Sequence, residues 1–273
     1  MGIAKVKTLI IALLVLVNAF FLTVILVDDF AAARTERQAI DNVCTILRSN
    51  GIMIEPDSIK KSSDIRAMRA SRDTEQEAAA ANALIGPVEM TDQGVIYLYN
   101  NPERGSAKFS IAGDFEFILN EGCIPSGESI LRTVNGLLRD MKFEAASLDV
   151  RRESSAEIVT VVGAYKGASI FNLTMDFMFS ESCLREVRGR YLTGIEPVES
   201  GSGISNVSTA LLGFLAAVKR GDVACSAVYS VEAGYQYSVV GSFGDRVIMP
   251  SWLVVTDMGR YIIDCESGDI RMI

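Results

Sequence analysis

The chain of 273 residues contains no histidine. Histidine is the usual general base near neutral pH and the commonest protein ligand of zinc, so its absence excludes Ser-His-Asp and Cys-His nucleophile systems and HExxH zinc sites. We therefore predict that the protein is not an enzyme. We expect no catalytic residue, no cofactor and no metal site.

Paired cysteines are missing as well. The five cysteines are dispersed, odd in number and without a C-x-x-C pair: Cys44, Cys123, Cys183, Cys225 and Cys265. An exported domain in an oxidising compartment would favour an even, paired set. We therefore expect five free or buried thiols, which behave as small hydrophobic residues.

Acidic residues are absent from the start of the chain. Lys5 and Lys7 are the only charged residues before Asp28, and all 34 Asp and Glu residues lie at or beyond that position. Removing those two lysines leaves 24 basic against 34 acidic residues. A surface with this excess of negative charge repels phosphate backbones, so a nucleic acid partner is not expected.

Residues 8–27 form an uncharged hydrophobic run. A helix of 20 residues is about 30 Å long, which matches the hydrocarbon thickness of a bilayer. Because lysines precede the run and aspartates follow it, the positive-inside rule places residues 1–7 in the cytoplasm. The sequence thus predicts a single-pass anchor in the cell membrane with an extracellular C-terminal domain.

A cleaved signal peptide is the competing interpretation, because Ala31, Ala32 and Ala33 offer small residues for cleavage. The apolar run is longer than the roughly 7–15 residues of a signal peptide, so we expect the anchor to be retained. Asn18 lies in the middle of the run, with Leu14 and Leu22 one turn away. A polar amide in the bilayer either hydrogen-bonds to a partner helix or is simply tolerated, and the first alternative makes these three residues a transmembrane contact.

The remaining sequence predicts an α+β ectodomain. A stalk helix over 31–49 ends at Gly51, and a second helix covers 74–84. Strands are predicted over 95–99, 108–112 and 115–119. We assign 28–122 to the stalk helix and an N-terminal α+β domain.

Beyond Pro125 one pattern occurs twice, a helix followed by four strands. The predicted helices cover 129–141 and 207–219, and a linker rich in Gly and Ser runs over 194–206. The predicted strands are 147–151, 157–164, 169–179 and 186–192, then 227–240, 246–256, 260–264 and 269–272. The C-terminal domain, 124–273, is thus expected to hold two similar units, 124–193 and 205–273, in which helices pack on antiparallel sheets. The aromatic side chains of Phe171, Phe177 and Phe179 are expected in a sheet core.

Few residues could carry chemistry. Asp114 and Glu116 share one face of a predicted strand, where two carboxylates could do the acid–base work of a glycosidase. The same pattern is typical of any solvated sheet face. Sequons begin at Asn172 and Asn206, and motifs this short arise by chance.

The two ends of the chain resemble the YycI family. The similar residues are Lys5-Val-Lys7-Thr8-Leu-Ile, Ala39-Ile40-Asp41-Asn42-Val43, Asn50-Gly51-Ile52, Pro250-Ser-Trp252-Leu-Val-Val and Tyr261-Ile-Ile-Asp264. The C-terminal run is also similar to PepSY-type strands, which implies cystatin- or PepSY-like sheets. YycI proteins are membrane-anchored regulators of a two-component system in low-GC Gram-positive bacteria. The resemblance implies contacts with a WalK-type sensor histidine kinase and a sister YycH-like protein, made through the membrane helix and the ectodomain.

We therefore predict an extracytoplasmic regulatory protein that binds and modulates a sensor histidine kinase. One alternative is a PepSY-like inhibitor or chaperone of an exported protease, suggested by the C-terminal strands. A carboxylate-dependent cell-wall hydrolase is a third. A kinase and response regulator encoded nearby would favour the first, and a secreted peptidase the second.

Overall fold

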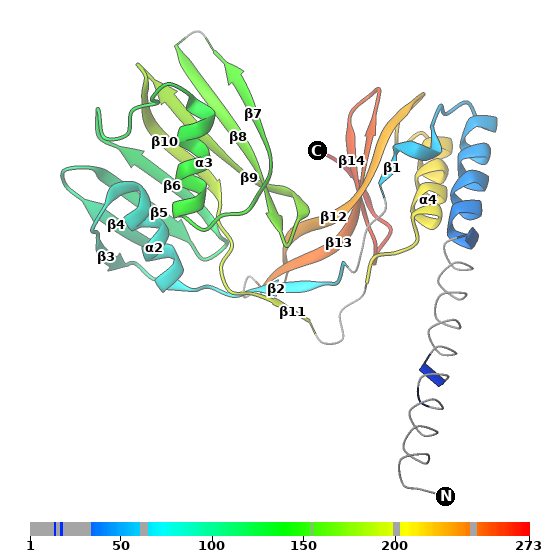
Figure 1. The fold of residues 1–273 in the computed structure, drawn as a ribbon, viewed down its shortest axis with the longest axis horizontal. Helices are drawn as coiled ribbons and strands as arrows, with labels where there is room; N and C mark the ends of the chain where they lie inside the picture. Colours follow the sequence, from blue (N-terminus) through cyan, green and yellow to red (C-terminus); the bar gives the residue numbers. More distant parts are fainter. Residues whose placement is uncertain are drawn as a thin grey trace, which may run out of the picture.

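The computed structural model describes residues 34–60, 65–153, 155–198, 203–240 and 245–273, together with Leu14, Val17 and Asn18. These residues form two lobes (Figure 1), which we call distal (the described residues of 71–193) and proximal (34–60, 65–70, 194–198, 203–240 and 245–273). Helices and a large, mainly antiparallel sheet make up the fold, so the predicted α+β class is confirmed.

The distal lobe is an eight-stranded antiparallel sheet with two helices. Its strands lie in the order β3-β4-β5-β6-β10-β9-β8-β7. The helices are α2 (Thr74–Ile85) and α3 (Ile130–Asp140). The strands are β3 (Glu89–Asp92), β4 (Ile96–Asn101), β5 (Gly105–Ser110), β6 (Asp114–Leu119), β7 (Ala145–Arg152), β8 (Ala156–Tyr165), β9 (Ala168–Ser180) and β10 (Cys183–Arg190).

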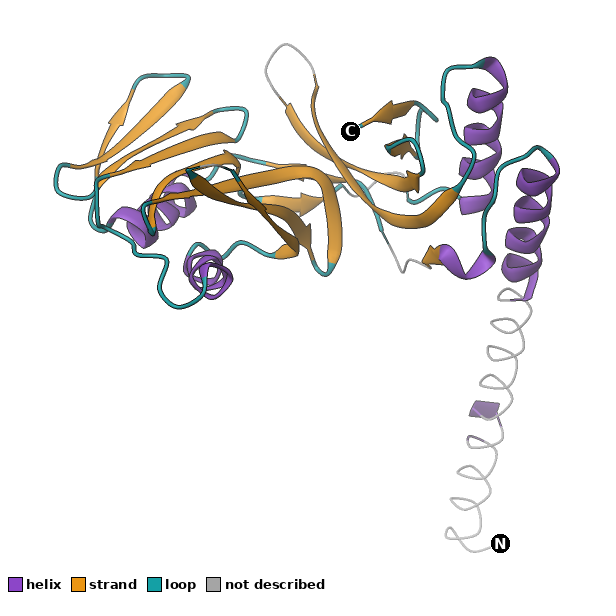
Figure 2. Cartoon of the chain, turned by 90° about the horizontal axis from the view of Figure 1, so that it is seen from above, coloured by secondary structure: helices purple, strands orange, loops and turns teal. Residues whose placement is uncertain are grey.

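Both distal helices cover the same face of this sheet, as Figure 2 shows from above. The Asp73 side chain caps α2 by accepting hydrogen bonds from the backbone N–H groups of Glu75 and Gln76. The core beneath the helices is rich in aromatic residues, and Phe109 and Phe117 meet edge to face at 5.6 Å. Phe177 and Phe179 lie in this core, as predicted.

The proximal lobe combines segments from both ends of the chain. From the N-terminal part come a helix over residues 34–49, the 3-10 turn η1 (Pro56–Ser58), β1 (Ile59–Lys60) and β2 (Met68–Ala70). The C-terminal part adds β11 (Ile195–Pro197), α4 (Val207–Arg220), β12 (Val228–Val240), β13 (Asp245–Thr256), β14 (Arg260–Asp264) and β15 (Ile270–Met272). Strands β12 to β15 pair in chain order as an antiparallel meander.

Helix 34–49 and α4 lie side by side against this meander (Figures 1 and 2). Leu47 of the first helix and Phe214 of α4 are fully buried in one core that also contains Trp252. The Trp252 indole N–H donates to the Ser205 carbonyl at 3.0 Å. The packing therefore joins residues that are more than 150 positions apart in the sequence.

The two lobes share a single sheet. Strand β9 pairs with β12 in parallel at Ile170 and Tyr235, which joins all 15 strands. The backbones approach closely here, because a Cβ on Gly234 would lie 2.5 Å from the Phe171 ring and from the Ser169 carbonyl oxygen. A small core around Ile170, Tyr237 and other buried residues fills the junction.

Packing crosses the boundaries drawn from the sequence. Strands β6 and β10 pair although they were assigned to different units, and the stalk helix packs on the unit 205–273. Within the range of the predicted linker, 194–206, strand β11 pairs with β2. The strands β1, β2, β3 and β11 were not predicted.

The predicted anchor, 8–27, lies outside the described residues except for Leu14, Val17 and Asn18. Among the residues that the structure describes, no helix is both long enough and apolar enough to cross a bilayer.

Candidate functional site

The predicted transmembrane contact is only partly within the described residues. Leu14 and Asn18 are both helical and exposed, and Leu14 is 59% exposed. Leu22 lies outside the described residues. The contact itself therefore stays a prediction.

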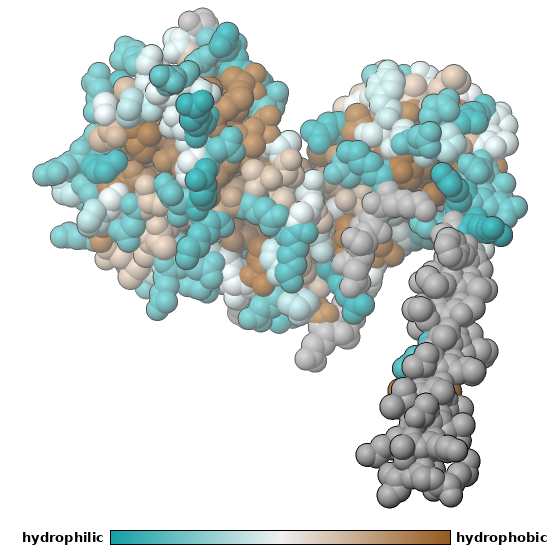
Figure 3. All heavy atoms as spheres, in the orientation of Figure 1, coloured by the Kyte–Doolittle hydropathy of each residue, from teal (hydrophilic) through white to brown (hydrophobic). Residues whose placement is uncertain are grey.

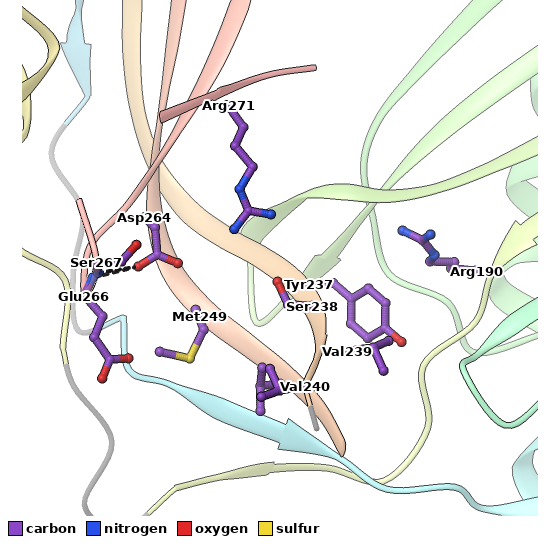
Figure 4. Close-up of a pocket in the computed structure, with 11 residues that line it drawn as sticks. Arg190, Tyr237, Ser238, Val239, Val240, Met249, Asp264, Glu266, Ser267 and Arg271 are labelled. Carbon is purple, nitrogen blue, oxygen red and sulfur yellow. Dashed lines mark hydrogen bonds between the residues drawn. The ribbon is translucent and has the colours of Figure 1, made fainter. Parts of the chain in front are cut away.

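A groove of about 680 Å³ lies at the junction of the lobes. Figure 3 shows the molecule hollowed between the lobes, with hydrophilic residues over much of their outer ends. Figure 4 shows Arg190 of the distal lobe beside Tyr237 of β12, with residues of β13, β14 and β15 further along the groove. The lining residues are Arg190, Tyr237, Ser238, Val239, Val240, Val247, Met249, Asp264, Glu266, Ser267 and Arg271.

Part of this lining is apolar and accessible to solvent. Val239 and Val240 are the last two residues of strand β12, and they are 47% and 52% exposed. Val247 and Met249 lie half-buried on the neighbouring strand β13. Exposed aliphatic side chains gathered in one groove, with a polar rim, are typical of a surface that binds another molecule.

Arg190 forms the distal wall of the groove. Its Nε–H donates to Asp114 Oδ1 at 2.9 Å, and its guanidinium carbon lies 5.3 Å from the centre of the Tyr237 ring. The Tyr237 hydroxyl in turn donates to the Ala112 carbonyl. Burial is the main cause that raises the pKa of Tyr237, so the hydroxyl keeps its proton as a donor. These contacts hold Arg190 in place across the lobe junction.

Arg271 projects into the groove from β15 (Figure 4). No described residue forms an ion pair with its guanidinium. The nearby Asp264 carboxylate is occupied in a turn, where it accepts hydrogen bonds from the backbone of Glu266 at 2.8 Å and of Ser267 at 3.0 Å. Arg271 is therefore available to an acceptor on a bound partner.

The carboxylates considered for acid–base chemistry form ion pairs on the open sheet face. Asp114 pairs with Arg190, and Glu116 lies 3.9 Å from Lys108. Among the described residues, no group of three His, Cys, Asp or Glu side chains could hold a metal ion. The chemistry that the groove offers is thus apolar contact combined with hydrogen bonding to arginine.

No pattern in the sequence marks this groove. Arg190 and Arg271 are 81 positions apart, and neither belongs to a motif. The run Val239-Val240 at the end of a long predicted strand was the one available signal, because alternation would place one of two adjacent valines on each face.

Comparisons with known proteins establish no family. No family model matches the chain and no curated protein matches it. The resemblance to the YycI family therefore stays a prediction from the residues.

Two solved structures are similar in outline. An uncharacterized protein from Eubacterium rectale has 10% identity and a TM-score of 0.49, with 78% of this chain and 86% of that chain covered. The YpeB C-terminal domain of Bacillus megaterium has 12% identity and a TM-score of 0.37, with 75% and 99% covered. At these levels of similarity neither neighbour informs the function.

Proposed function

We propose that the chain is a membrane-anchored regulatory protein whose ectodomain binds a partner protein in the groove between the lobes. The observation that supports this most is the exposed apolar lining, Val239 and Val240, between Arg190 and Arg271, which has no ion-pair partner among the described residues. Such a surface suits a partner segment that carries an aliphatic side chain next to a carboxylate.

The partner in this proposal is a sensor histidine kinase of a two-component system. The predicted anchor, with a cytoplasmic N-terminus and an extracellular ectodomain, supports it, as does the resemblance of both chain ends to YycI proteins. A regulator of this kind needs only a difference in contact energy between two kinase states, typically about 1–3 kcal/mol. The proposal includes a PepSY-like sheet, a contribution from a YycH-like sister protein, and no enzymatic activity.

Site-specific photocrosslinking in membranes tests the groove. A photoreactive phenylalanine analogue at Met249 is expected to crosslink the kinase, and the Arg271→Glu change is expected to weaken that crosslink. The same analogue at Met90 is the matched control, because Met90 is 52% exposed on β3 at the far edge of the distal lobe. A kinase crosslink of equal strength at both positions, or at neither, rejects the groove as the contact.

The same experiment distinguishes the alternative partner. A crosslink from Met249 to an exported peptidase would replace the kinase with the protease inhibitor or chaperone function. The membrane contact is tested separately by Asn18→Leu. Losing one interhelical hydrogen bond changes association by about 0.6 kcal/mol, or 1.7 at most, so we expect a several-fold change in kinase output at normal protein level.

A further inference from the structure

Unpartnered polar atoms gather where the lobes meet. Four buried side-chain nitrogen or oxygen atoms lack a hydrogen-bond partner among the described residues, and three of them are Arg72 Nη1, Ser110 Oγ and Arg246 Nη1. Native proteins leave few such groups unsatisfied, so three at one place call for an explanation.

Both arginines contact the segment 109–113, which contains Ser110 and the turn between β5 and β6. Arg72 Nη2 donates to the carbonyl of Phe109, the residue before Ser110, at 3.4 Å. From the proximal lobe, Arg246 reaches the same turn, because a Cβ built on Gly113 would lie 3.7 Å from Arg246 Nη1. Side chains of both lobes thus converge on one short segment.

The charges at this place do not balance. Arg72 forms a two-point ion pair with Glu77, with nitrogen–oxygen distances of 2.9 and 2.8 Å, and Glu77 is 2% exposed. The Tyr99 hydroxyl also donates to Glu77, at 3.4 Å. Arg246 is only 4% exposed, and none of the carboxylates whose side chains the structure describes lies within 4.0 Å of it. Glu77 therefore pairs with the half-buried Arg72, and the buried Arg246 has no such partner among the carboxylates whose side chains the structure describes.

Burying a charged guanidinium without a counter-charge is unfavourable in free energy, and arginine stays protonated in proteins, so the charge remains. Burial lowers the pKa of Arg246, and the charges of Glu77 and Arg72 are near enough to influence it. Both unpartnered arginine atoms are donors, and a serine hydroxyl can also donate. The group that satisfies all three is an acceptor with negative charge.

We propose that Arg246, Arg72 and Ser110 bind a small monovalent inorganic anion of the chloride class at the lobe junction. The anion links the lobes, because Arg246 belongs to β13 whereas Arg72 and Ser110 belong to the distal lobe. Arg246 also pairs across the hairpin with Val239, which lines the groove. Occupancy of the anion site therefore stabilises the strand end on which the groove is built.

Thermal unfolding of the full chain in detergent tests the proposal, with sodium chloride, sodium bromide and sodium gluconate compared at equal ionic strength. The two halides are expected to raise the unfolding midpoint by about 2–4 °C over gluconate once they exceed the dissociation constant several-fold. The rise should saturate with halide concentration. Crystals grown in bromide are expected to show an anomalous scattering peak within hydrogen-bonding distance of Arg246.

Arg246→Gln should abolish the difference between halide and gluconate. Arg260→Gln is the matched control, since Arg260 is exposed on β14, and it should keep the difference. Equal midpoints in all three salts and no bromide peak would overturn the proposal and leave buried water as the partner of these atoms. If Arg246→Gln does not fold, the salt series on the wild-type protein and the bromide crystal still test whether an anion binds at this site.

Discussion

The two lobes differ in how far apart in the sequence the segments that form their hydrophobic cores lie. The distal lobe is one continuous stretch of chain, and its strands pair with one another within 71–193, apart from the single contact of β9 with β12. The proximal lobe is held together by strand pairs between segments that are distant in the sequence, such as Ile59 with Val231 and Met68 with Ile248. Contacts of large sequence separation must overcome a greater loop-closure entropy before packing stabilises them. The comparison suggests that the distal lobe is an autonomous unit, whereas the proximal lobe depends on the whole chain.

The points where the chain enters and leaves the distal lobe support this view. The Ser71 N–H donates to the Gly194 carbonyl at 3.1 Å, and the Thr193 hydroxyl donates to the Ser71 carbonyl at 3.0 Å. An inserted unit with adjacent ends exerts little strain on its host, so the distal lobe has the geometry of an insertion.

The largest effect is expected when the lobes are separated. A fragment of residues 71–193 should fold by itself, because the core of α2, α3 and the eight strands lies within it. A fragment of residues 203–273 should not fold, since Ile40, Val43 and Leu47 of its core are missing. Circular dichroism, amide hydrogen exchange and thermal unfolding would measure both. Cooperative unfolding of the fragment 203–273, or the absence of cooperative unfolding in the fragment 71–193, would contradict this difference between the lobes.

A smaller effect is expected at the joint. The Asn172 side chain acts as an additional strand partner, because Nδ2 donates to the Tyr237 carbonyl and Oδ1 accepts from the Tyr237 N–H, both at 2.7 Å. Asn172→Ala would leave two half-buried backbone groups without these bonds, a loss of about 1–3 kcal/mol in the free energy of unfolding.

Asn135→Ala is the control for that change, because exposed Asn135 only donates to Leu131 within its own helix. Its effect should stay within about 0.5 kcal/mol in denaturant unfolding. Equal effects of the two substitutions would mean that Asn172 does not hold the lobes together.

The smallest effect concerns the thiols, all five of which are free in the structure. Burial, reinforced by the charge of Asp257, raises the pKa of Cys225 to about 11. The thiolate reacts and the thiol does not, so alkylation of Cys225 should be slow at pH 8 and accelerate as the pH rises toward 11. Intact mass measured over time would show this, with denatured protein as the rapidly reacting control.

The same measurement without reductant should show no bridge between Cys225 and Cys265. Cys225 lies beside Asp257, whereas the Cys265 N–H donates to the Pro250 carbonyl. Seven residues of extended chain separate these two positions by about 20 Å, far beyond the reach of a disulfide. A bridge in protein from intact cells would require a different arrangement of the proximal lobe.

The elements with strong local patterns were predictable from the sequence. Helix α4 and strand β14 agree with their predictions to within one residue, because helical periodicity and alternation are properties of a short window. The strands β1, β2 and β11 have only two or three residues, and β3 is exposed throughout. Their strand character comes from distant partners, which a local pattern does not contain.

The groove could not be predicted from the sequence for the same reason. Its arginines are brought together by the pairing of β9 with β12, a parallel contact that involves one residue pair. Nothing in the periodicity of either strand indicates this pairing. The buried Arg246 was equally hidden, since in the sequence it is an ordinary charge at the start of a strand.

The two sequon asparagines have a consequence for producing this protein in a eukaryotic secretory host. Asn172 is committed to the Tyr237 backbone, and the Asn206 side chain caps α4 by accepting from the Ser208 N–H at 2.8 Å. A glycan attached to the Asn172 amide before folding would occupy the nitrogen that donates to the Tyr237 carbonyl. The Asn206 cap uses the side-chain oxygen of an exposed residue, so a glycan on its nitrogen leaves that contact in place. Material secreted from such a host should therefore carry unmodified Asn172 in its folded fraction, and chains glycosylated at Asn172 should accumulate among the misfolded ones.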